Sequence, residues 1–184
     1  MGAERRCMKC NPDVHHRKNI RLKEYDYSKE GMYFITICTK DRERLFGNII
    51  NRKMKLNEYG KMVEEEIINT NKIRQNVRIG EYIIMPNHVH MIIEIIDVGV
   101  AWYATQGKVE RSKMIIPKII QQIKTITIKK ANRINESGLH TMQPLQWQRN
   151  YYEHIIRNEK ELYRIIEYIK YNPLNWENDS NYKI

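Results

Sequence analysis

The stretch Tyr82-Ile-Ile-Met-Pro-Asn-His-Val-His-Met-Ile-Ile-Glu-Ile-Ile96 decides the predicted fold. It contains two apolar runs, residues 82–85 and 89–96, which are separated by Pro86, Asn87 and His88. Apolar, β-branched runs of this length predict strands, and Pro and Asn are frequent turn residues. We therefore expect two neighbouring strands joined by a short connection.

Two histidines of this stretch, His88 and His90, form the first candidate site. Side chains two residues apart in a strand point to the same face, so the two imidazoles would lie side by side, with Val89 and Met91 buried opposite. Such a pair can bind one divalent metal ion. Glu94 lies further along the same face and is a candidate for a supporting group. The spacing also fits two histidines near a turn that bind nothing, and both interpretations stay open at this point.

The remaining elements predict an α+β fold with an antiparallel sheet, because strands and helices are segregated rather than strictly alternating. Residues 32–39 are expected to form a further strand, and residues 145–156 an extended segment. Apolar residues at helical spacing predict helices over residues 57–73, over residues 116 to about 137, and over residues 158–172. Asn57 and Asn158 are suitable N-caps, and Gly138 and Pro173 are suitable ends.

The chain is expected to fold as one domain. Its 184 residues have the size of a single domain, and no linker rich in Gly, Pro or Ser divides them. The expected parts are a basic N-terminal arm at residues 1–20, the domain at residues 21–177 and a polar tail at residues 178–184. No apolar run approaches the ~20 residues of a membrane helix, and the start of the chain does not resemble a secretory signal. A cytoplasmic protein is therefore expected.

The charge of the chain predicts a polyanionic partner. Lys and Arg number 32 and Asp and Glu 22, which gives a formal net charge of +10, and the pI is near 9.5. A surplus of this size on a small domain favours nucleic-acid binding through the release of counterions. The charge indicates the class of partner that the protein binds, but it does not indicate a reaction.

Cysteine usage offers one incomplete metal motif near the N-terminus. Cys7 and Cys10 form a C-x-x-C pair followed by His15 and His16, but a second ligand pair at the usual spacing is missing. A zinc site and an ordinary flexible chain end are the two interpretations. Cys38 lies in an apolar run and is expected to be a small core residue.

The last predicted helix carries a second candidate group. Tyr168 and Asn172 are four residues apart, so they lie on the same side of the helix, at the edge of its apolar stripe. From that edge the tyrosine hydroxyl could act as a nucleophile and the amide oxygen as a third metal ligand. The alternative is an amphipathic tyrosine beside the core, which is the usual position of a helical tyrosine.

Seven segments together resemble the REP-associated tyrosine transposases, which belong to the HUH single-tyrosine transposase superfamily. The U denotes a bulky apolar residue, here Val89, and the resemblance extends over about residues 11–177. The segments are Asn11-Pro-Asp-Val-His-His-Arg, Arg21-Leu-Lys-Glu-Tyr-Asp-Tyr, Tyr33-Phe-Ile-Thr-Ile-Cys-Thr, Leu45-Phe-Gly, Met85-Pro-Asn-His-Val-His, Trp147-Gln-Arg-Asn-Tyr-Tyr-Glu-His-Ile-Ile-Arg and Tyr168-Ile-Lys-Tyr-Asn-Pro.

The resemblance implies a ferredoxin-like antiparallel sheet with helices on one face. The histidine pair would lie on a central strand, and the C-terminal helix would present Tyr168 as the nucleophile. His88, His90 and Asn172 would hold Mg²⁺ or Mn²⁺, and His154 is a second candidate for the metal shell or for a phosphate contact. The rival nucleophiles are Tyr151, Tyr152, Tyr163 and Tyr171.

The implied activity is the nicking and joining of single-stranded DNA beside palindromic hairpins, through a 5′-phosphotyrosine intermediate. Two alternatives remain: a hairpin-binding protein without catalysis, and a metal-dependent nuclease in which activated water attacks. The superfamily contains monomers and dimers, so a homodimer stays open.

Basic and aromatic side chains are expected to hold the DNA. Trp147, Tyr151 and Tyr152 could stack on unpaired bases or pack in the core. The candidate DNA-binding residues are Lys124, Lys129, Lys130 and Arg133 on the isoleucine-rich helix, together with Arg149 and Arg157.

Overall fold

A computed structural model describes residues 30–96, 114–136, 143–179 and 181. The predicted N-terminal arm, the Cys7–Cys10 group with its two histidines, and the helix end at Gly138 lie outside the described residues. None of the described helices is long and apolar enough to cross a membrane.

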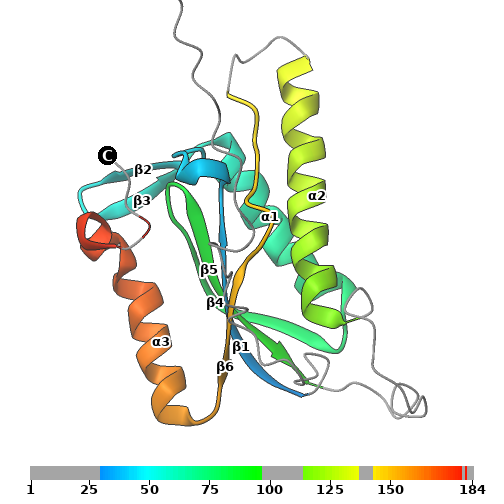
Figure 1. Ribbon diagram of the computed structural model, residues 1–184, viewed down its shortest axis with the longest axis vertical. Coiled ribbons are helices and arrows are strands. Elements are labelled where there is room, and N and C mark those ends of the chain that lie inside the picture. Colours follow the sequence, from blue (N-terminus) through cyan, green and yellow to red (C-terminus); the bar gives the residue numbers. More distant parts are fainter. Residues whose placement is uncertain (1–29, 97–113, 137–142, 180, 182–184) are drawn as a thin grey trace, which may run out of the picture.

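Four strands form one antiparallel sheet in the order β4-β5-β1-β6 (Figure 1). They are β1 (Gly31–Cys38), β4 (Val77–Ile84), β5 (His88–Ile95) and β6 (Tyr152–Ile156). Because β5 lies between β4 and β1, and β1 lies between β5 and β6, the chain makes the two interleaved β-α-β units of a ferredoxin-like sheet. The predicted α+β class is confirmed, and the histidine pair lies on a central strand as expected.

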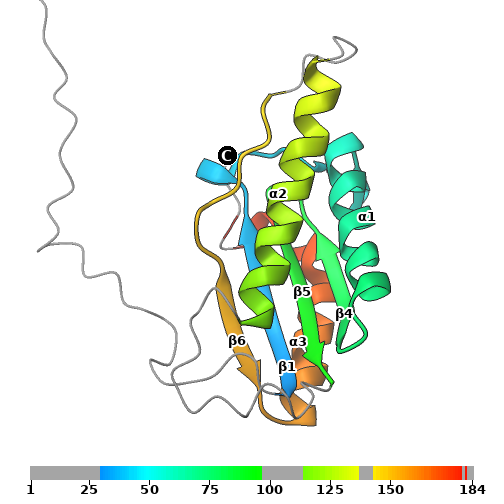
Figure 2. The same cartoon turned by 90° about the vertical axis from the view of Figure 1, so that its right-hand side faces the viewer.

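The helices cover both faces of this sheet. Helices α1 (Glu58–Ile73) and α2 (Ile115–Glu136) pack on one face, as the ferredoxin-like pattern implies, while α3 (Glu159–Tyr171) lies on the other (Figures 1 and 2). The expectation of helices on one face is therefore wrong for α3. The physical reason is that β1 and β5 are apolar on both faces and need cover on each side.

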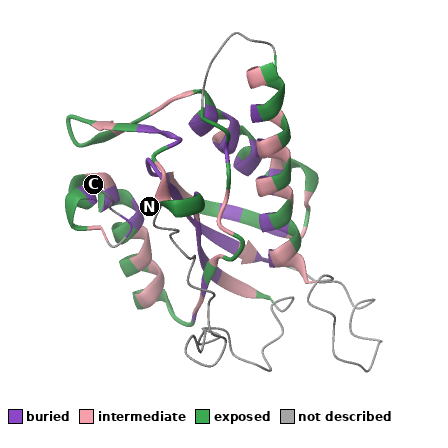
Figure 3. Cartoon of the chain, turned by 45° about the horizontal axis from the view of Figure 1, so that its top comes forward, coloured by how far each residue is buried: buried purple, intermediate pink, exposed green. Residues whose placement is uncertain are grey.

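Two apolar clusters follow from this arrangement. The larger cluster joins Tyr33, Val89 and Met91 of the sheet to α1 and α2. The smaller cluster joins Phe34 and Ile92 to α3. Figure 3 shows the buried residues concentrated in the strands and on the inward sides of the helices. The smaller cluster fixes α3 against the sheet face that carries His88 and His90.

The N-caps observed in the structure are the ones that the sequence predicted. Asn57 Oδ1 accepts a hydrogen bond from the Gly60 N–H at 3.0 Å, and Asn158 Oδ1 accepts one from the Glu161 N–H at 2.9 Å. The α3 helix ends at Tyr171, but Pro173 does not end the helical path. The chain continues in a 3-10 helix, η4 (Asn172–Asn178), because a proline in the first turn needs no hydrogen-bond partner for its nitrogen.

Two elements differ from the prediction. Strand β4 begins at Val77, five residues early, and contains a bulge between Ile79 and Tyr82 that interrupts its alternation. A hairpin of β2 (Gly47–Ile50) and β3 (Lys53–Leu56) was not predicted. Its turn lacks the usual glycine, and Asn51 and Arg52 adopt φ of 51° and 60° instead.

The predicted extended segment 145–156 forms a strand only at β6. Before β6, Trp147 makes a single bridge to Thr39. Cys38 at the end of β1 is only partly buried and does not belong to the core, contrary to expectation. Burial raises the pKa of its thiol above the usual value.

Candidate active site

The two histidines of β5 are buried and face each other. His88 is 0% exposed and His90 2%, and their Nε2 atoms lie 2.9 Å apart. The strand begins directly after the turn at Pro86 and Asn87, so the pair sits at the end of a central strand. The predicted side-by-side arrangement is confirmed.

Asn87 fixes the orientation and the proton of His88. The Asn87 amide nitrogen donates to the backbone carbonyls of Arg42 at 3.0 Å and Asn181 at 2.8 Å. Its oxygen is therefore turned to His88 Nδ1, at 2.8 Å, and can only accept. His88 thus carries its proton on Nδ1 and directs the lone pair of Nε2 towards His90.

His90 is held by groups of β1. Its Nδ1 lies 2.8 Å from Thr36 Oγ1, and the Phe34 ring stacks on the imidazole with the centroids 5.3 Å apart.

Burial lowers the pKa of His88 to about 4. Burial, reinforced by His88, lowers the pKa of His90 to about 3. Both rings are therefore neutral at pH 7, which is the state in which imidazole binds a metal.

Helix α3 brings Tyr168 to this pair. Ile169 of α3 is 1% exposed and packs with Phe34 and Ile92, while Tyr168 next to it is 43% exposed. The Tyr168 hydroxyl lies 3.2 Å from His90 Nε2. The structure thus joins the two candidate groups that the sequence placed on separate elements.

The rival tyrosines occupy other positions among the described residues. Tyr151 packs against the larger core cluster, on the far face of the sheet. Tyr163 and Tyr171 on α3 are 66% and 55% exposed. Tyr152 of β6 contacts Phe34 edge-on, with the centroids 6.3 Å apart. Among the tyrosine hydroxyls of the described residues, the contact with the histidine pair belongs to Tyr168.

Asp179 completes the group, and the sequence did not indicate it. Its Oδ2 accepts from the Asn172 amide at 2.9 Å and from the Tyr168 hydroxyl at 3.3 Å, and its Oδ1 accepts from the Asn181 N–H at 2.6 Å. One carboxylate oxygen and one nitrogen of each histidine lie within 4.8 Å of one another, so His88, His90 and Asp179 could hold a metal ion. Asp179 follows the last helix in a polar tail without a motif. An acidic side chain close behind the tyrosine helix was the available signal.

Asn172 carries a buried amide oxygen that could act as a ligand. The residue is 2% exposed, and its amide nitrogen is engaged by Asp179. Its Oδ1 is buried without a hydrogen-bond partner among the described residues. A buried acceptor of this kind costs about 1–3 kcal/mol. Two neutral imidazoles, one carboxylate and one unsatisfied amide oxygen are a donor set that fits a divalent cation.

The electrostatics of the group keep Tyr168 protonated. Burial, followed by the negative charge of Asp179, raises the pKa of Tyr168 to about 12. Burial also raises the pKa of Asp179, but hydrogen bonds from Asn181 and Asn172 and the nearby histidines bring it below its usual value. The carboxylate is therefore ionised at neutral pH, and the phenol retains its proton unless a positive charge is added nearby.

Two further sequence candidates do not join this group. His154 of β6 contacts Glu161 of α3, with Nε2 and Oε1 2.7 Å apart. Glu161 also accepts from the Arg157 N–H at 2.9 Å, so this contact ties β6 to the start of α3. Glu94, at the far end of β5, pairs with Arg78 at 3.7 Å.

The basic residues of α2 lie on the sheet face opposite the histidine pair. Lys124 donates to the backbone carbonyls of Gln148 at 2.7 Å and Asn150 at 3.1 Å, which fixes the segment before β6. Lys130 pairs with Glu65 of α1 at 3.1 Å. Exposed side chains are found at Lys129, Arg133, Arg149 and Arg157. Their DNA contacts stay a prediction.

A cavity of about 380 Å³ opens the group to solvent. The Trp147 indole is not part of it, because its N–H donates to Thr127 Oγ1 at 3.1 Å and its ring packs on Phe46 in the core. Tyr152, by contrast, lines the cavity. The lining residues are Phe34, Thr36, Cys38, Arg42, His90, Gln148, Asn150, Tyr152, Tyr168 and Asn181.

Comparison with known proteins shows what the chain is similar to. A solved structure of a REP-associated tyrosine transposase bound to a REP hairpin superimposes with a TM-score of 0.52 at 22% identity, over 85% of this chain and 73% of that one. A Haemophilus influenzae protein that is assigned by name to the REP-associated tyrosine transposases is 26% identical over 155 residues, 81% of this chain and 73% of its own length. The chain therefore shares the fold of that solved REP-associated tyrosine transposase.

An uncharacterized protein of the same organism is 44% identical to this chain over 181 residues, which covers 95% of this chain and 97% of that protein. No family model matches the chain. The shared fold and the name of the 26% identical relative agree with the family resemblance that the sequence motifs carried.

Proposed function

We propose that this protein is a transposase that nicks and rejoins single-stranded DNA beside hairpin-forming repeats, with Tyr168 as the nucleophile. The observation that carries the proposal is the contact of the Tyr168 hydroxyl with His90 Nε2 at 3.2 Å, inside a group of metal-binding character. The bound REP hairpin of the similar solved structure supports the choice of DNA substrate. The net charge of +10 supports it as well.

Of the four candidate donors, His88, His90 and Asn172 are the residues that would hold Mg²⁺ or Mn²⁺, while Asp179 would take the proton of Tyr168. Their donor atoms fit such an ion, because both imidazoles are neutral and Asn172 Oδ1 has no hydrogen-bond partner among the described residues. A bound ion supplies positive charge that polarises the scissile phosphate and stabilises its developing negative charge. Asn87 and Thr36 orient the two rings through their Nδ1 atoms.

In the proposed reaction, the Tyr168 oxygen attacks phosphorus and forms an O–P bond, while the bond from phosphorus to the 3′ oxygen breaks. The leaving 3′ oxygen takes up a proton and becomes a hydroxyl, and the 5′-phosphate stays on the tyrosine. Asp179 Oδ2, 3.3 Å from the phenol oxygen, accepts the phenolic proton as the new bond forms. The reverse attack by a 3′-hydroxyl rejoins strands without ATP, because the phosphodiester energy is kept in the tyrosyl ester.

The cavity at Tyr168 gives the strand its approach. Tyr152 is 43% exposed and lines the cavity with Tyr168. Its ring offers a face on which an unpaired base can stack, a contact that tolerates any base. Arg42 also lines this cavity and is placed to bind a phosphate of the same strand.

One observation favours a second candidate function, a nuclease in which water attacks. The pKa of Tyr168, raised to about 12, makes the phenol a poor nucleophile in the absence of added positive charge. In that case Tyr168 would orient the phosphate, and the product would form without a covalent intermediate.

The deciding experiment is a search for a covalent protein–DNA adduct. Wild-type protein, Tyr168→Phe and Tyr171→Phe are incubated with labelled hairpin DNA and Mn²⁺, and the products are separated under denaturing conditions. We expect an adduct with wild type and Tyr171→Phe, and none with Tyr168→Phe. An adduct that persists in Tyr168→Phe would refute the nucleophile assignment. Cleavage without an adduct supports the nuclease, and hairpin binding without cleavage supports a binding protein.

A further inference from the structure

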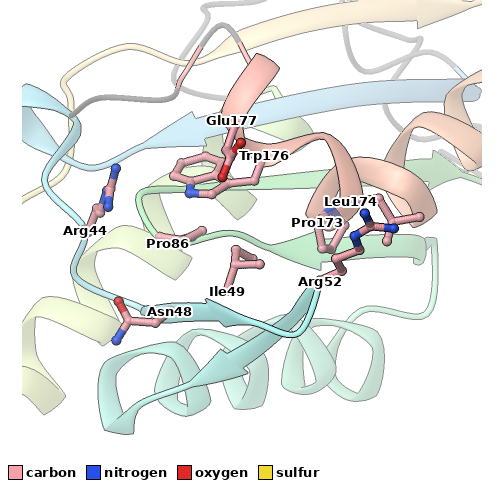
Figure 4. A pocket seen from close by; sticks show the side chains of 9 residues that line it. All are labelled: Arg44, Asn48, Ile49, Arg52, Pro86, Pro173, Leu174, Trp176 and Glu177. Atoms are coloured by element: carbon pink, nitrogen blue, oxygen red, sulfur yellow. The ribbon is translucent and has the colours of Figure 1, made fainter.

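Two cavities flank the candidate active site, and they share no lining residue among the described residues. One, of about 480 Å³, has Trp176, Pro86 and the β2–β3 hairpin on its walls (Figure 4). The other, of about 380 Å³, is the cavity at Tyr168, and part of its wall is formed by Gln148 and Asn150 in the segment before β6. This wall shapes the space in front of the proposed nucleophile.

The segment before β6 bulges away from β1 at this wall. The pairing of β6 with β1 ends at Tyr152 and Thr36, and the next contact is the bridge of Trp147 with Thr39. Between these contacts β1 has two residues, whereas the other side has four, residues 148–151. A bulge of this kind redirects side chains and leaves backbone groups unpaired in the sheet, and bulges are frequent next to active sites.

Lys124 of α2 satisfies the carbonyls of this bulge. Its ammonium donates to the Gln148 carbonyl oxygen at 2.7 Å and to the Asn150 carbonyl oxygen at 3.1 Å. Hydrogen bonds from a charged donor are stronger than those from a neutral one. Ile120 and Ile123 beside Lys124 are buried in the larger core cluster, so the position of the ammonium is itself fixed. The bulge is thus tied to the core through Lys124.

The side chains of Gln148 and Asn150 are left available for a ligand. Both line the cavity, and within the described part of the chain their side-chain amides make no hydrogen bond. A side-chain amide offers both N–H donors and an acceptor oxygen, so it can bind a phosphate, a sugar or the edge of a base. Lys124 therefore holds the backbone of the wall, and the two amides equip its surface.

We propose that Lys124 is a positioning residue, which holds the bulge so that Gln148 and Asn150 hydrogen-bond the DNA strand in front of Tyr168. The inference rests on the proposed function, because the ligand is the strand that Tyr168 attacks. Lys124 acts on the DNA through these two side chains and makes no phosphate contact of its own. It thus serves DNA binding indirectly, whereas the sequence predicted a direct contact.

The two amides should affect binding rather than the chemical step. Among the described contacts, neither Gln148 nor Asn150 touches the Tyr168 hydroxyl or the histidine pair. Contacts away from the reacting atoms stabilise the bound strand equally before and during the reaction. Their loss therefore raises the half-saturating concentration and leaves the maximal rate unchanged. The loss of two ordinary hydrogen bonds corresponds to about tenfold.

The test measures the rate of adduct formation on labelled hairpin DNA with Mn²⁺, over a range of concentrations of protein in excess. Lys124→Met and the double variant Gln148→Ala/Asn150→Ala should each raise the half-saturating concentration about tenfold. Lys124→Arg should restore it, because a guanidinium can donate to both carbonyls. Lys72→Met, an equal loss of charge on the exposed side of α1, should leave both values unchanged.

The combination of Lys124→Met with the double variant decides whether Lys124 acts through the two amides. We expect no further loss when they are combined, whereas a direct phosphate contact would multiply the two effects. As a reference, Lys124→Met should multiply with Asn48→Ala, which lies in the other cavity (Figure 4). Multiplied effects in both pairs would overturn the positioning role. Equal effects of Lys124→Met and Lys72→Met, or a loss confined to the maximal rate, would overturn it as well.

Hydrogen exchange of the free protein tests the bulge without DNA. Lys124→Met should speed exchange in residues 146–151, and Lys124→Arg and Lys72→Met should not; unchanged exchange in Lys124→Met would overturn the role of the ammonium. The double alanine variant changes only side chains at the cavity surface, so it tests the amide contacts even where Lys124→Met lowers stability. A wild type that forms no adduct would contradict the proposed function instead. The same tenfold pattern is then sought in hairpin affinity, and its absence would overturn the inference.

Discussion

Acid should unfold this protein through its two buried histidines. The pKa of His88 is about 4 and that of His90 about 3 in the fold, against 6.5 for a free imidazole. Between pH 6.5 and pH 4 the unfolded chain therefore binds protons that the folded chain does not. By linkage, stability is then lost as the pH falls. From pH 7 to pH 5, each histidine lowers the free energy of unfolding by about 2 kcal/mol.

The variant His90→Asn isolates one of these contributions. Asparagine can keep the contact with Thr36 while it removes the titrating ring. We expect the loss between pH 7 and pH 5 to be about 2 kcal/mol smaller in the variant than in wild type. The measurement is denaturant unfolding at both pH values in the presence of a chelator, so that no metal contributes. Equal losses in the two proteins would refute a buried, neutral His90.

Three more outcomes follow from the same contacts. Asp179→Asn removes the negative charge beside the Tyr168 hydroxyl, and should move its pKa from about 12 towards 10 in ¹³C NMR of labelled tyrosines; an unchanged value would contradict the contact. Asn172→Ala should weaken Mn²⁺ binding by about tenfold or more in calorimetry, whereas an unaltered affinity would exclude Asn172 as a ligand. Gly60→Ala should destabilise the fold by about 1–3 kcal/mol in urea, although alanine favours helices, because its Cβ would overlap the Phe46 carbonyl oxygen.

The sequence predicted well wherever a local pattern carries the structure. Asn57 and Asn158 were expected as N-caps because a side-chain acceptor there satisfies a free N–H, and both make that bond. His88 and His90 were expected side by side from the strand period alone. These features depend on residues that are neighbours in the chain.

Features that depend on distant residues were predicted less well. The hairpin at Asn51 and Arg52 lacks the glycine that marks such turns. The opposite placement of α3 depends on which sheet face remains uncovered after α1 and α2 have packed. Asp179 reaches the site only because η4 turns the chain back towards β5. Without a motif or a periodic pattern, tertiary packing alone decides such positions.

Only part of the candidate site was predicted from the sequence, because its residues come from distant parts of the chain. The family resemblance nominated Tyr168 and Asn172, and the structure brings Tyr168 to His90 and Asn172 to Asp179. The charge pattern nominated Lys124 and Lys130, which instead contact backbone carbonyls and Glu65. A basic side chain on a helix often serves the fold, and sequence alone does not distinguish that role from a contact with DNA.

The most direct test of Tyr168 as the nucleophile is to locate the covalent link by mass spectrometry. After reaction with hairpin DNA and Mn²⁺, nuclease removes most of the DNA and trypsin cuts after Arg164 and Lys170. Tyr168 is then the sole tyrosine of peptide 165–170, while Tyr163 and Tyr171 fall in the neighbouring peptides and Tyr151 and Tyr152 in peptide 150–157. We expect a phosphonucleotide remnant on peptide 165–170. A remnant on any other of these peptides, or cleaved DNA with no modified peptide, would contradict the mechanism.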